Sequence, residues 1–339
     1  MQTTRLGRTG LQVSRTAFGA LPIQRVDFDT ARAILTRAVD GGVTFIDTAS
    51  GYSDSEEKIG YALADRRDEL VIATKCSGAK NRADVIAKVE QSLHRMKTDH
   101  VDILQLHNPS ELPDPADPES TYAGLLEARE RGLTRFIGIT NHTRSLAVEA
   151  VESGLYDTLQ FPLSAISSAE DFELAELCDR HDVGFIAMKA LCGGLLSNAR
   201  LAFAGLRPYA NVVPIWGIQK LEELEEILAL EADPPELTPA LEAEIEREKA
   251  ELAGGFCRAC GYCLPCRVGI NIPIAARIGL MVKRLPSARF ATEEFQAEMA
   301  KVEECIDCGD CRSRCPYHLD PPALMRTHRR QYLEWLESA

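Results

Sequence analysis

The fold of this chain can be read from three short apolar runs: Val43-Thr-Phe-Ile-Asp47, Leu70-Val-Ile-Ala-Thr74 and Val101-Asp-Ile-Leu-Gln-Leu106. Each run is rich in β-branched and aliphatic residues, as the buried strands of a parallel sheet are. Amphipathic segments of helical length separate them, for example residues 55–63 and 84–96. Strands and helices in strict alternation predict a parallel sheet, because each helix returns the chain to begin the next strand in the same direction.

The same alternation extends outward from these three runs. Five further runs begin at Thr16, Arg135, Leu159, Val183 and Val212, so eight strands are expected in all. Eight strand–helix repeats in roughly 230 residues favour a closed (β/α)8 barrel, that is, a TIM barrel of the α/β class. The alternative is an open doubly wound sheet. That fold normally has a G-x-G-x-x-G turn after its first strand, and the sequence contains no such motif.

Composition and net charge limit the classes of protein to which this chain can belong. The chain has 339 residues, 45% hydrophobic and 26% charged, which is typical of a soluble globular protein with about two domains. Its 38 basic and 51 acidic residues give a formal charge of −13, so we expect no binding to nucleic acid or to membranes. The amino terminus lacks the apolar stretch of a secretory signal, and we expect a cytoplasmic protein.

The cysteines divide the chain in two. Eight of the eleven lie between positions 257 and 315, and in a chain without a secretory signal this crowding argues for metal ligation over disulfides. Asp233-Pro-Pro marks a boundary between the predicted barrel and this region. We therefore expect a barrel domain at residues 1–233 and a mostly α-helical, ferredoxin-like domain at residues 234–339, with helices near 241–252, 273–285 and 292–302.

Two cysteine runs point to iron–sulfur clusters. The run Cys305-x2-Cys308-x2-Cys311-x3-Cys315-Pro316 has the spacing of bacterial ferredoxins, whereas Cys257-x2-Cys260-x2-Cys263-x2-Cys266 departs from it by a shorter last gap and by Arg267 in place of proline. If the crossed ligand pattern of two-cluster ferredoxins applies, Cys315 joins Cys257, Cys260 and Cys263, and Cys266 joins Cys305, Cys308 and Cys311. We expect two [4Fe–4S] clusters. Two four-cysteine zinc sites are the alternative.

Polar residues follow three consecutive predicted strands. Asp47 ends the second strand and is followed by Tyr52, Lys75 ends the third, and the fourth runs into His107. In a barrel of parallel strands the carboxyl ends meet at one mouth, so these four side chains should lie together.

The segments that contain these residues resemble those of a known protein family. Residues 45–56, 72–75 and 102–107 are similar to signature segments of the aldo-keto reductase family, and the likeness extends over nearly all of residues 1–230. It implies a barrel that binds NADP(H) or NAD(H) and reduces a small-molecule carbonyl substrate by hydride transfer. It also implies that Tyr52 is the general acid, that Lys75 and Asp47 are its tuning partners, and that His107 orients the substrate oxygen.

Physical chemistry gives these roles an independent basis. A tyrosine of pKa about 10 is roughly three units, or about 4 kcal/mol, too weak an acid for neutral pH. An ammonium about 4 Å away supplies on the order of 4 kcal/mol to the phenolate at an effective dielectric near 20. We therefore expect Lys75 to lower the pKa of Tyr52, Asp47 to compensate the buried ammonium, and a neutral His107 to donate to the carbonyl oxygen.

The resemblance also suggests residues that bind the dinucleotide. They follow the last four predicted strands and are Thr140, Asn141, Gln160, Met188, Lys189, Leu191, Gly193, Gly194, Gly217, Gln219 and Lys220. The sequence departs from many relatives at Glu223, where they have an arginine, and Lys220 is expected to be the one cation nearby. A 2′-phosphate needs several donors, so a weakened preference for NADP over NAD is one interpretation. A solvated helix face is the other.

The whole chain resembles the branch of aldo-keto reductases with a carboxy-terminal ferredoxin-like extension. The clusters could be structural, could sense redox state, or could conduct single electrons from an external electron carrier. Two other functions stay open. One is a redox-sensing or electron-transfer iron–sulfur protein with a nicotinamide-binding barrel, and the other is a barrel used for acid–base elimination or isomerisation.

Overall fold

A computed structural model describes residues 1–252, 255–285 and 288–338. The chain forms two compact units. The first comprises residues 1–190 and 199–242, and the second comprises residues 191–198 and 243–339. The short stretch 191–198 therefore belongs with the carboxy-terminal part of the chain, although it lies within the barrel sequence.

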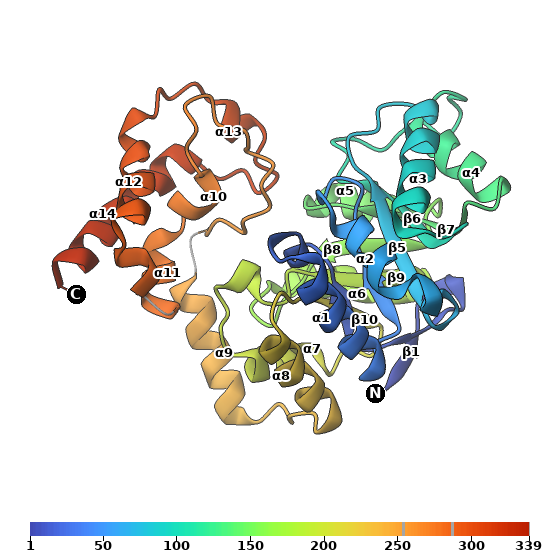
Figure 1. Ribbon diagram of the computed structural model, residues 1–339, viewed down its shortest axis with the longest axis horizontal. Coiled ribbons are helices and arrows are strands. Elements are labelled where there is room, and N and C mark those ends of the chain that lie inside the picture. Colours follow the sequence, from blue (N-terminus) through green and yellow to red (C-terminus); the bar gives the residue numbers. More distant parts are fainter. Residues whose placement is uncertain (253–254, 286–287, 339) are drawn as a thin grey trace. The chain divides into compact units, whose positions relative to one another are not determined.

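The first unit is the predicted (β/α)8 barrel, which the structure confirms (Figure 1). Eight parallel strands close in the order β10-β3-β4-β5-β6-β7-β8-β9. Each strand falls within one or two residues of a run expected from the sequence. The strands are β3 (Ala17–Gly19), β4 (Phe45–Asp47), β5 (Val71–Cys76), β6 (Val101–His107), β7 (Thr134–Thr140), β8 (Thr158–Pro162), β9 (Gly184–Met188) and β10 (Val212–Gly217).

Helices follow the strands, and several begin at a residue that caps them. The side chains of Asp27, Asn81, Ser120 and Ser168 each accept a hydrogen bond from the first turn of the helix that follows, which satisfies a backbone N–H left unpaired there. The helices are α1 (Phe28–Asp40), α2 (Ser55–Leu63), α3 (Arg82–Met96), α4 (Thr121–Glu130), α5 (Arg144–Glu152), α6 (Ala169–Arg180), α7 (Ala199–Leu206) and α8 (Leu221–Ala232).

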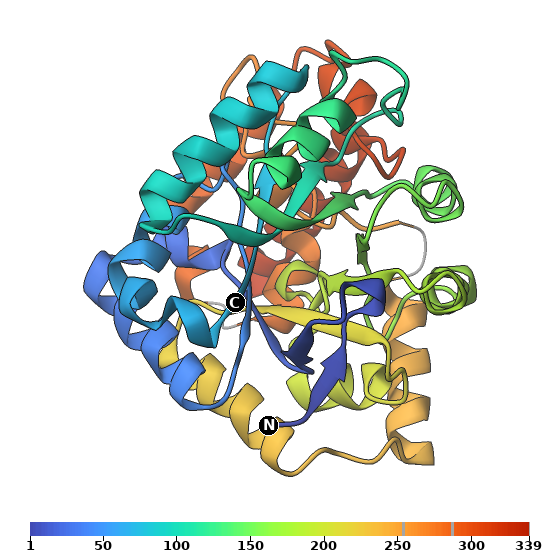
Figure 2. The same cartoon turned by 90° about the vertical axis from the view of Figure 1, so that its right-hand side faces the viewer.

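An amino-terminal hairpin packs against the amino ends of the strands. Strands β1 (Thr3–Arg5) and β2 (Gln12–Ser14) pair antiparallel and are dark blue in Figure 2. Leu6, Leu11 and Val13 share a buried cluster with residues of the barrel strands. Gly7, with φ +50°, approaches β9 so closely that a Cβ would lie 2.2 Å from the Gly184 nitrogen, so only glycine fits there.

The second unit is mostly helical, as expected. The predicted helix over residues 273–285 is two shorter helices, and the last helix packs along both of them. Tyr332 of that helix donates a hydrogen bond of 2.5 Å to the Phe290 carbonyl. The helices are α9 (Pro239–Glu251), α10 (Ile272–Ala275), α11 (Ile278–Arg284), α12 (Glu293–Ala300), α13 (Asp310–Ser313) and α14 (Pro321–Ser338). Among the helices in the described parts of the chain, none combines the length and apolar character of a membrane span.

Candidate functional site

Strand register brings a lysine and an aspartate together inside the barrel. Asp47 of β4 pairs with Ala73 of β5, and because side chains alternate along a strand, Lys75 faces the same interior as Ala73. Lys75 Nζ donates to Asp47 Oδ2 at 2.6 Å and to the Thr48 carbonyl at 2.5 Å. Both side chains are almost completely withdrawn from water, with relative exposures of 1% and 2%.

Tyr52 and His107 lie beside this ion pair. Lys75 Nζ is over the face of the Tyr52 ring, 5.1 Å from its centre. The Tyr52 and His107 rings meet edge to face with their centres 6.0 Å apart. The structure therefore brings together the four side chains that the sequence places after β4, β5 and β6.

Burial controls the ionisation of the group. Burial raises the pKa of the Asp47 carboxyl and lowers the pKa of the Lys75 ammonium, and their contact opposes both shifts. Burial, followed by the repulsion of Lys75, lowers the pKa of His107 to about 3, so this imidazole is neutral at physiological pH.

The pKa of Tyr52 moves in the direction opposite to our expectation. Burial first, and then the Asp47 carboxylate, raise it well above its ordinary value. The reason is that Lys75 and Asp47 form a pair with no net charge, so the attraction of a phenolate to the ammonium is offset by the carboxylate. Tyr52 therefore keeps its proton at neutral pH.

Ser77 is a residue of the site that the sequence alone did not lead us to predict. Its Oγ lies 2.6 Å from His107 Nδ1 and also accepts a hydrogen bond from the Gly51 backbone N–H. A hydroxyl that already accepts one hydrogen bond has its own proton to give, and His107 Nδ1 is in position to accept it. With this hydrogen bond from Ser77, the His107 proton would be on Nε2. The signal in the sequence was only a hydroxyl two residues after Lys75.

Gln105 is a further polar residue of the site that the sequence did not single out, and it lies beside Gln160. The Gln105 Nε2 donates to Asp47 Oδ1 at 3.3 Å and to Gln160 Oε1 at 3.1 Å. Gln160 Nε2 donates to Asp47 Oδ2 at 3.3 Å. Both amides thus bind the carboxylate of the ion pair. Gln105 stands two residues before His107 on β6 and shares its face, a pattern that could have marked it.

The side chains of Thr140 and Asn141 engage the loop after β6. Thr140 Oγ1 accepts from the Asn108 backbone N–H at 3.1 Å. Asn141 Nδ2 donates to the Pro109 carbonyl at 3.1 Å, while its Oδ1 accepts from Thr143 N at 2.7 Å. Strand pairing also brings these residues next to Gln160, since Asn141 N donates to the Gln160 carbonyl.

The residues after β9 divide between the two units. Met188 ends the strand and is buried in the barrel, and Lys189 follows it with a φ of +64°. Leu191, Gly193 and Gly194 belong to the second unit. Both glycines have positive φ, and a Cβ on Gly194 would meet nothing within 4 Å. Open space beside bare backbone is what a phosphate group needs in order to approach amide groups closely.

The amino end of α8 is occupied by its own acidic side chain. Glu223 Oε2 accepts hydrogen bonds from Gln219 N at 2.9 Å and from Lys220 N at 3.2 Å. Gly217 ends β10 just before this turn. Our expectation that Lys220 is the one cation here was wrong, because Arg25 also lies beside Gln219, with Nη1 3.4 Å from its Oε1. Arg25 precedes the barrel's first helix, so sequence distance hid it.

Eight cysteine thiols surround two cavities in the second unit. Cavity A is bounded by Cys257, Cys260, Cys263 and Cys315, together with Arg258 and Tyr317. Cavity B is bounded by Cys266, Cys305, Cys308 and Cys311, and it also reaches Cys263. Cavity A thus has the four thiols that the crossed pattern assigns to one cluster, and cavity B has the other four and Cys263 as well, so the assignment of ligands to each cluster stays a prediction.

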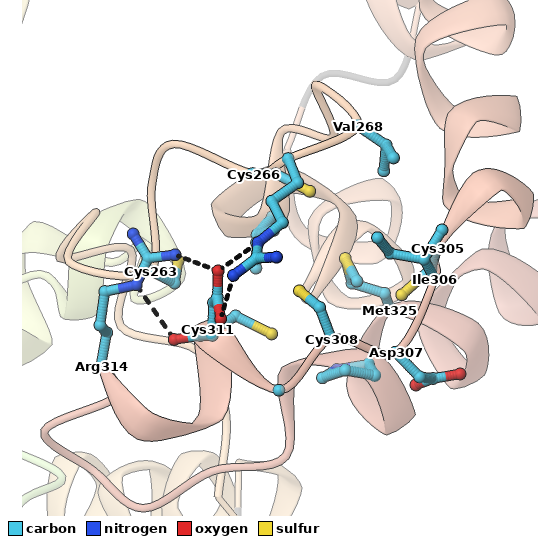
Figure 3. Close-up of a pocket in the computed structure, with 15 residues that line it drawn as sticks. Cys263, Cys266, Val268, Cys305, Ile306, Asp307, Cys308, Cys311, Arg314 and Met325 are labelled. Carbon is cyan, nitrogen blue, oxygen red and sulfur yellow. Dashed lines mark hydrogen bonds and ion pairs between the residues drawn. The ribbon is translucent and has the colours of Figure 1, made fainter.

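Cavity B opens to solvent. Figure 3 shows the sulfur atoms of its four cysteines around a common space, with Arg314 and the neighbouring ion pairs at its rim. Cys308 and Ile306 are exposed there. Within residues 1–252, 255–285 and 288–338, no three histidine, cysteine or acidic side chains are grouped closely enough to share one metal ion. Four thiols around one cavity are the donor set that a [4Fe–4S] cluster takes from a protein.

Comparisons with known proteins find a family match in the barrel part of the chain and another in the cysteine-rich part. Residues 15–208 match the aldo/keto reductase family, and residues 256–320 match the 4Fe-4S dicluster domain. The aldo-keto reductase YhdN of Bacillus subtilis is 29% identical over 225 residues, which cover 58% of this chain and 64% of that protein. L-galactose dehydrogenase of Arabidopsis thaliana is 31% identical over 211 residues, covering 57% and 66%.

A solved structure shares the fold. An aldo-keto reductase from Klebsiella pneumoniae in complex with NADPH superposes with a TM-score of 0.64. The superposition covers 73% of this chain and 95% of that one, at 22% sequence identity. The likeness at this identity concerns the barrel architecture.

The neutral state of His107 predicts a pH dependence of stability. An unfolded histidine takes up a proton below a pH of about 6.5, whereas folded His107 resists protonation down to a pKa of about 3. Its contribution to stability is therefore complete above pH 6.5 and is lost as the pH falls towards 3. Between pH 7 and 5.5 we expect the wild type to lose about 1 kcal/mol more unfolding free energy than His107→Gln.

Anaerobic denaturant unfolding at the two pH values measures this difference. His94→Gln is the control, since His94 is an exposed histidine of α3. Equal losses in the wild type and His107→Gln would contradict the assignment of a neutral buried imidazole.

Proposed function

This chain belongs to the aldo/keto reductase family, and from that membership we propose that it reduces the carbonyl group of a small aldehyde or ketone. The observation that carries the proposal is the group formed by Asp47, Tyr52, Lys75 and His107 at the carboxyl ends of three neighbouring strands. A nicotinamide dinucleotide supplies the hydride when it is bound.

Tyr52 is the proposed proton donor. Its raised pKa supports this role, because a phenol that stays protonated is always ready to donate as negative charge grows on the carbonyl oxygen. The alkoxide that would form is a stronger base than a phenolate, so the proton still moves downhill. Lys75 then holds the ring and limits the cost of its brief negative charge, while Asp47 keeps Lys75 in place.

His107 is the proposed second donor to the same oxygen. A neutral imidazole with Nδ1 facing the Ser77 hydroxyl carries its proton on Nε2, where it can donate to the substrate. We assign Ser77 the role of fixing this tautomer. Gln105 and Gln160 are assigned the role of orienting the Asp47 carboxylate.

The residues proposed for the dinucleotide lie at or after the ends of β7 to β10 in the sequence. At Gly194, where φ is positive and a Cβ would meet nothing within 4 Å, the backbone leaves room for a phosphate group. The residues proposed to hold the dinucleotide are Thr140, Asn141, Gln160, Met188, Lys189, Leu191, Gly193, Gly194, Gly217, Gln219 and Lys220.

A 2′-phosphate fits less well at the amino end of α8. Glu223 already uses the amide donors of Gln219 and Lys220, and its charge repels a second anion. Arg25 partly compensates. We therefore propose that NADH is accepted along with NADPH.

We also propose two [4Fe–4S] clusters, one in cavity A and one in cavity B. The match to a dicluster domain and the two groups of four thiols support this count. Cys257, Cys260, Cys263 and Cys315 would hold one cluster, and Cys266, Cys305, Cys308 and Cys311 the other.

Replacing Tyr52 tests the proposed reaction. We expect Tyr52→Phe to lose at least about a hundredfold in kcat for NADPH-dependent reduction of small aldehydes, because the proton donor is gone. The dissociation constant for NADPH should stay within about twofold, measured by fluorescence titration. Tyr61→Phe is the matched control, since Tyr61 is an exposed tyrosine of α2 that bonds to Asp29.

Turnover by Tyr52→Phe near the wild-type rate would remove Tyr52 from the role of proton donor. Two other results would contradict the reductase itself. Product formed by the wild type without nicotinamide would point to elimination or isomerisation, and binding of NADPH without turnover on a broad carbonyl panel would point to a redox sensor.

Glu223 provides a test of cofactor preference. We expect Glu223→Gln to shift the ratio of the NADH and NADPH dissociation constants towards NADPH by roughly tenfold, because a charge facing the 2′-phosphate is removed. Glu222→Gln, at the neighbouring exposed glutamate, is the control. A wild type that prefers NADPH by more than about a hundredfold would contradict the proposal.

Metal analysis tests the clusters. Anaerobically purified wild type should contain about eight irons per chain, and Cys308→Ala and Cys257→Ala about four each, because each removes a ligand of one cluster. Cys178→Ala changes a buried thiol of α6 and should leave the iron content at the wild-type value. Two zinc ions and no iron in the wild type would refute the assignment.

A further inference from the structure

The turn between β4 and α2 carries Tyr52, and it is bonded both to the end of β5 and to α3. Ser50 N donates to the Lys75 carbonyl at 3.1 Å, and Ser50 Oγ accepts from Ser77 N at 3.0 Å. The Ser50 carbonyl accepts from Arg95 Nη1 at 3.2 Å. Arg95 stands in the last turn of α3, so a helix of the outer layer holds the turn that carries the proposed proton donor.

A buried carboxylate of α2 holds the arginine in place. Arg95 Nη1 lies 3.3 Å from Glu56 Oε2, and Glu56 Oε1 accepts from Thr74 Oγ1 at 2.7 Å. The Glu56 side chain is only 1% exposed, whereas that of Arg95 is 23% exposed. A carboxylate withdrawn from water is costly unless donors of this kind satisfy it. Arg95, Glu56 and Thr74 therefore form one fixed group, which is attached to β5 next to Lys75.

The backbone of Arg95 is fixed as well, because α2 and α3 approach each other closely at this point. A Cβ built on Gly60 of α2 would lie 2.4 Å from the Arg95 carbonyl oxygen, so only glycine fits there. The guanidinium consequently extends from a rigid base to the Ser50 carbonyl.

The same turn also reaches His107. Gly51 N donates to Ser77 Oγ at 3.1 Å, and Ser77 Oγ lies 2.6 Å from His107 Nδ1. Because Gly51 stands between Ser50 and Tyr52, a displacement of the Ser50 carbonyl would move both Tyr52 and the hydroxyl that faces His107. A misplacement of about 1 Å at a reacting group can cost about a hundredfold in rate.

We propose that Arg95 is a positioning residue for both proposed donors to the substrate oxygen, Tyr52 and His107. By holding the Ser50 carbonyl, it keeps residues 50–52 in the conformation that proton donation requires, so this turn does not have to be ordered during the reaction. Arg95 acts through the turn and not on the substrate. This inference rests on the proposed function of the barrel.

The test removes Arg95 in a Glu56→Gln background, because Arg95→Ala alone would leave the buried Glu56 carboxylate without its counter-charge. The glutamine oxygen still accepts hydrogen bonds, so Arg95 keeps its bond to Ser50 in the reference protein. We expect Arg95→Ala to lower kcat for NADPH-dependent aldehyde reduction about tenfold or more relative to this reference. The dissociation constant for NADPH should stay within about twofold.

Arg82→Ala in the same background is the matched control. Arg82 lies at the start of α3 and pairs with Glu127, far along the helix from Arg95. Its kcat should stay within about twofold of the reference, because no bond to the turn at Ser50 is lost.

Rescue from solution separates positioning from a general loss of structure. The Arg95 side chain is partly exposed, so a guanidinium ion can enter the space that Arg95→Ala leaves. Guanidinium chloride, well below concentrations that unfold the protein, should restore kcat of Arg95→Ala about threefold or more. It should not raise kcat of Arg82→Ala or Tyr52→Phe. Tetramethylammonium chloride, a cation without N–H donors, should restore nothing.

The outcomes distinguish this role from the proposed function. A wild type without carbonyl turnover removes the proposed function and the role of Arg95 with it. A wild type that turns over, with Arg95→Ala and Arg82→Ala equal in kcat, overturns the role of Arg95 alone. A loss in Arg95→Ala that guanidinium does not reverse is a loss of structure and also overturns it. If the Glu56→Gln chain does not fold, guanidinium rescue of Arg95→Ala in the otherwise wild-type chain decides in the same way.

Discussion

A lysine ammonium and an aspartate carboxylate, both shut off from water, hold the carboxyl end of the barrel together. Lys75 Nζ and Asp47 Oδ2 lie 2.6 Å apart, and the two residues are on neighbouring strands. Removing one partner of such a pair leaves a buried charge without its counter-charge, which lowers the free energy of unfolding by about 3–5 kcal/mol. Tyr52 packs on the ammonium, and the amides of Gln105 and Gln160 bind the carboxylate. The arrangement of the whole group therefore depends on this contact.

The barrel and much of its site could be predicted because strands and strand ends leave strong signals. Eight apolar runs marked the strands, and Asp47, Lys75 and His107 were conspicuous as polar residues where those runs stop. Ser77 and Gln105 gave weaker signals, since one polar residue near an apolar strand resembles an ordinary turn or core residue. The direction of the Tyr52 pKa shift could not be predicted from residue types alone. It depends first on burial and then on the Asp47 carboxylate, and both are properties of the folded chain.

In the cysteine-rich part of the chain, features set by neighbouring residues could likewise be predicted, whereas contacts between residues far apart in the sequence could not. Cysteine spacing is local, and it was enough to mark the eight cysteines of this region as candidate ligands. A hydrogen bond from Arg277 to the Gly193 carbonyl joins residues 84 positions apart, and nothing in the sequence around either residue marks it. Arg25 beside Gln219 is a similar case. Contacts made by arginines with remote segments have no periodic pattern, so only coordinates reveal them.

Residues 191–198 belong to the second unit but lie within the barrel sequence. Neither unit can therefore be cut out of the chain as one continuous segment. A shortened protein ending after the barrel would retain Leu195 and Leu196, which are buried in the intact chain, yet would lack Arg284, which donates to the Leu195 carbonyl. The cysteine-rich half expressed by itself would lack a segment of its own fold.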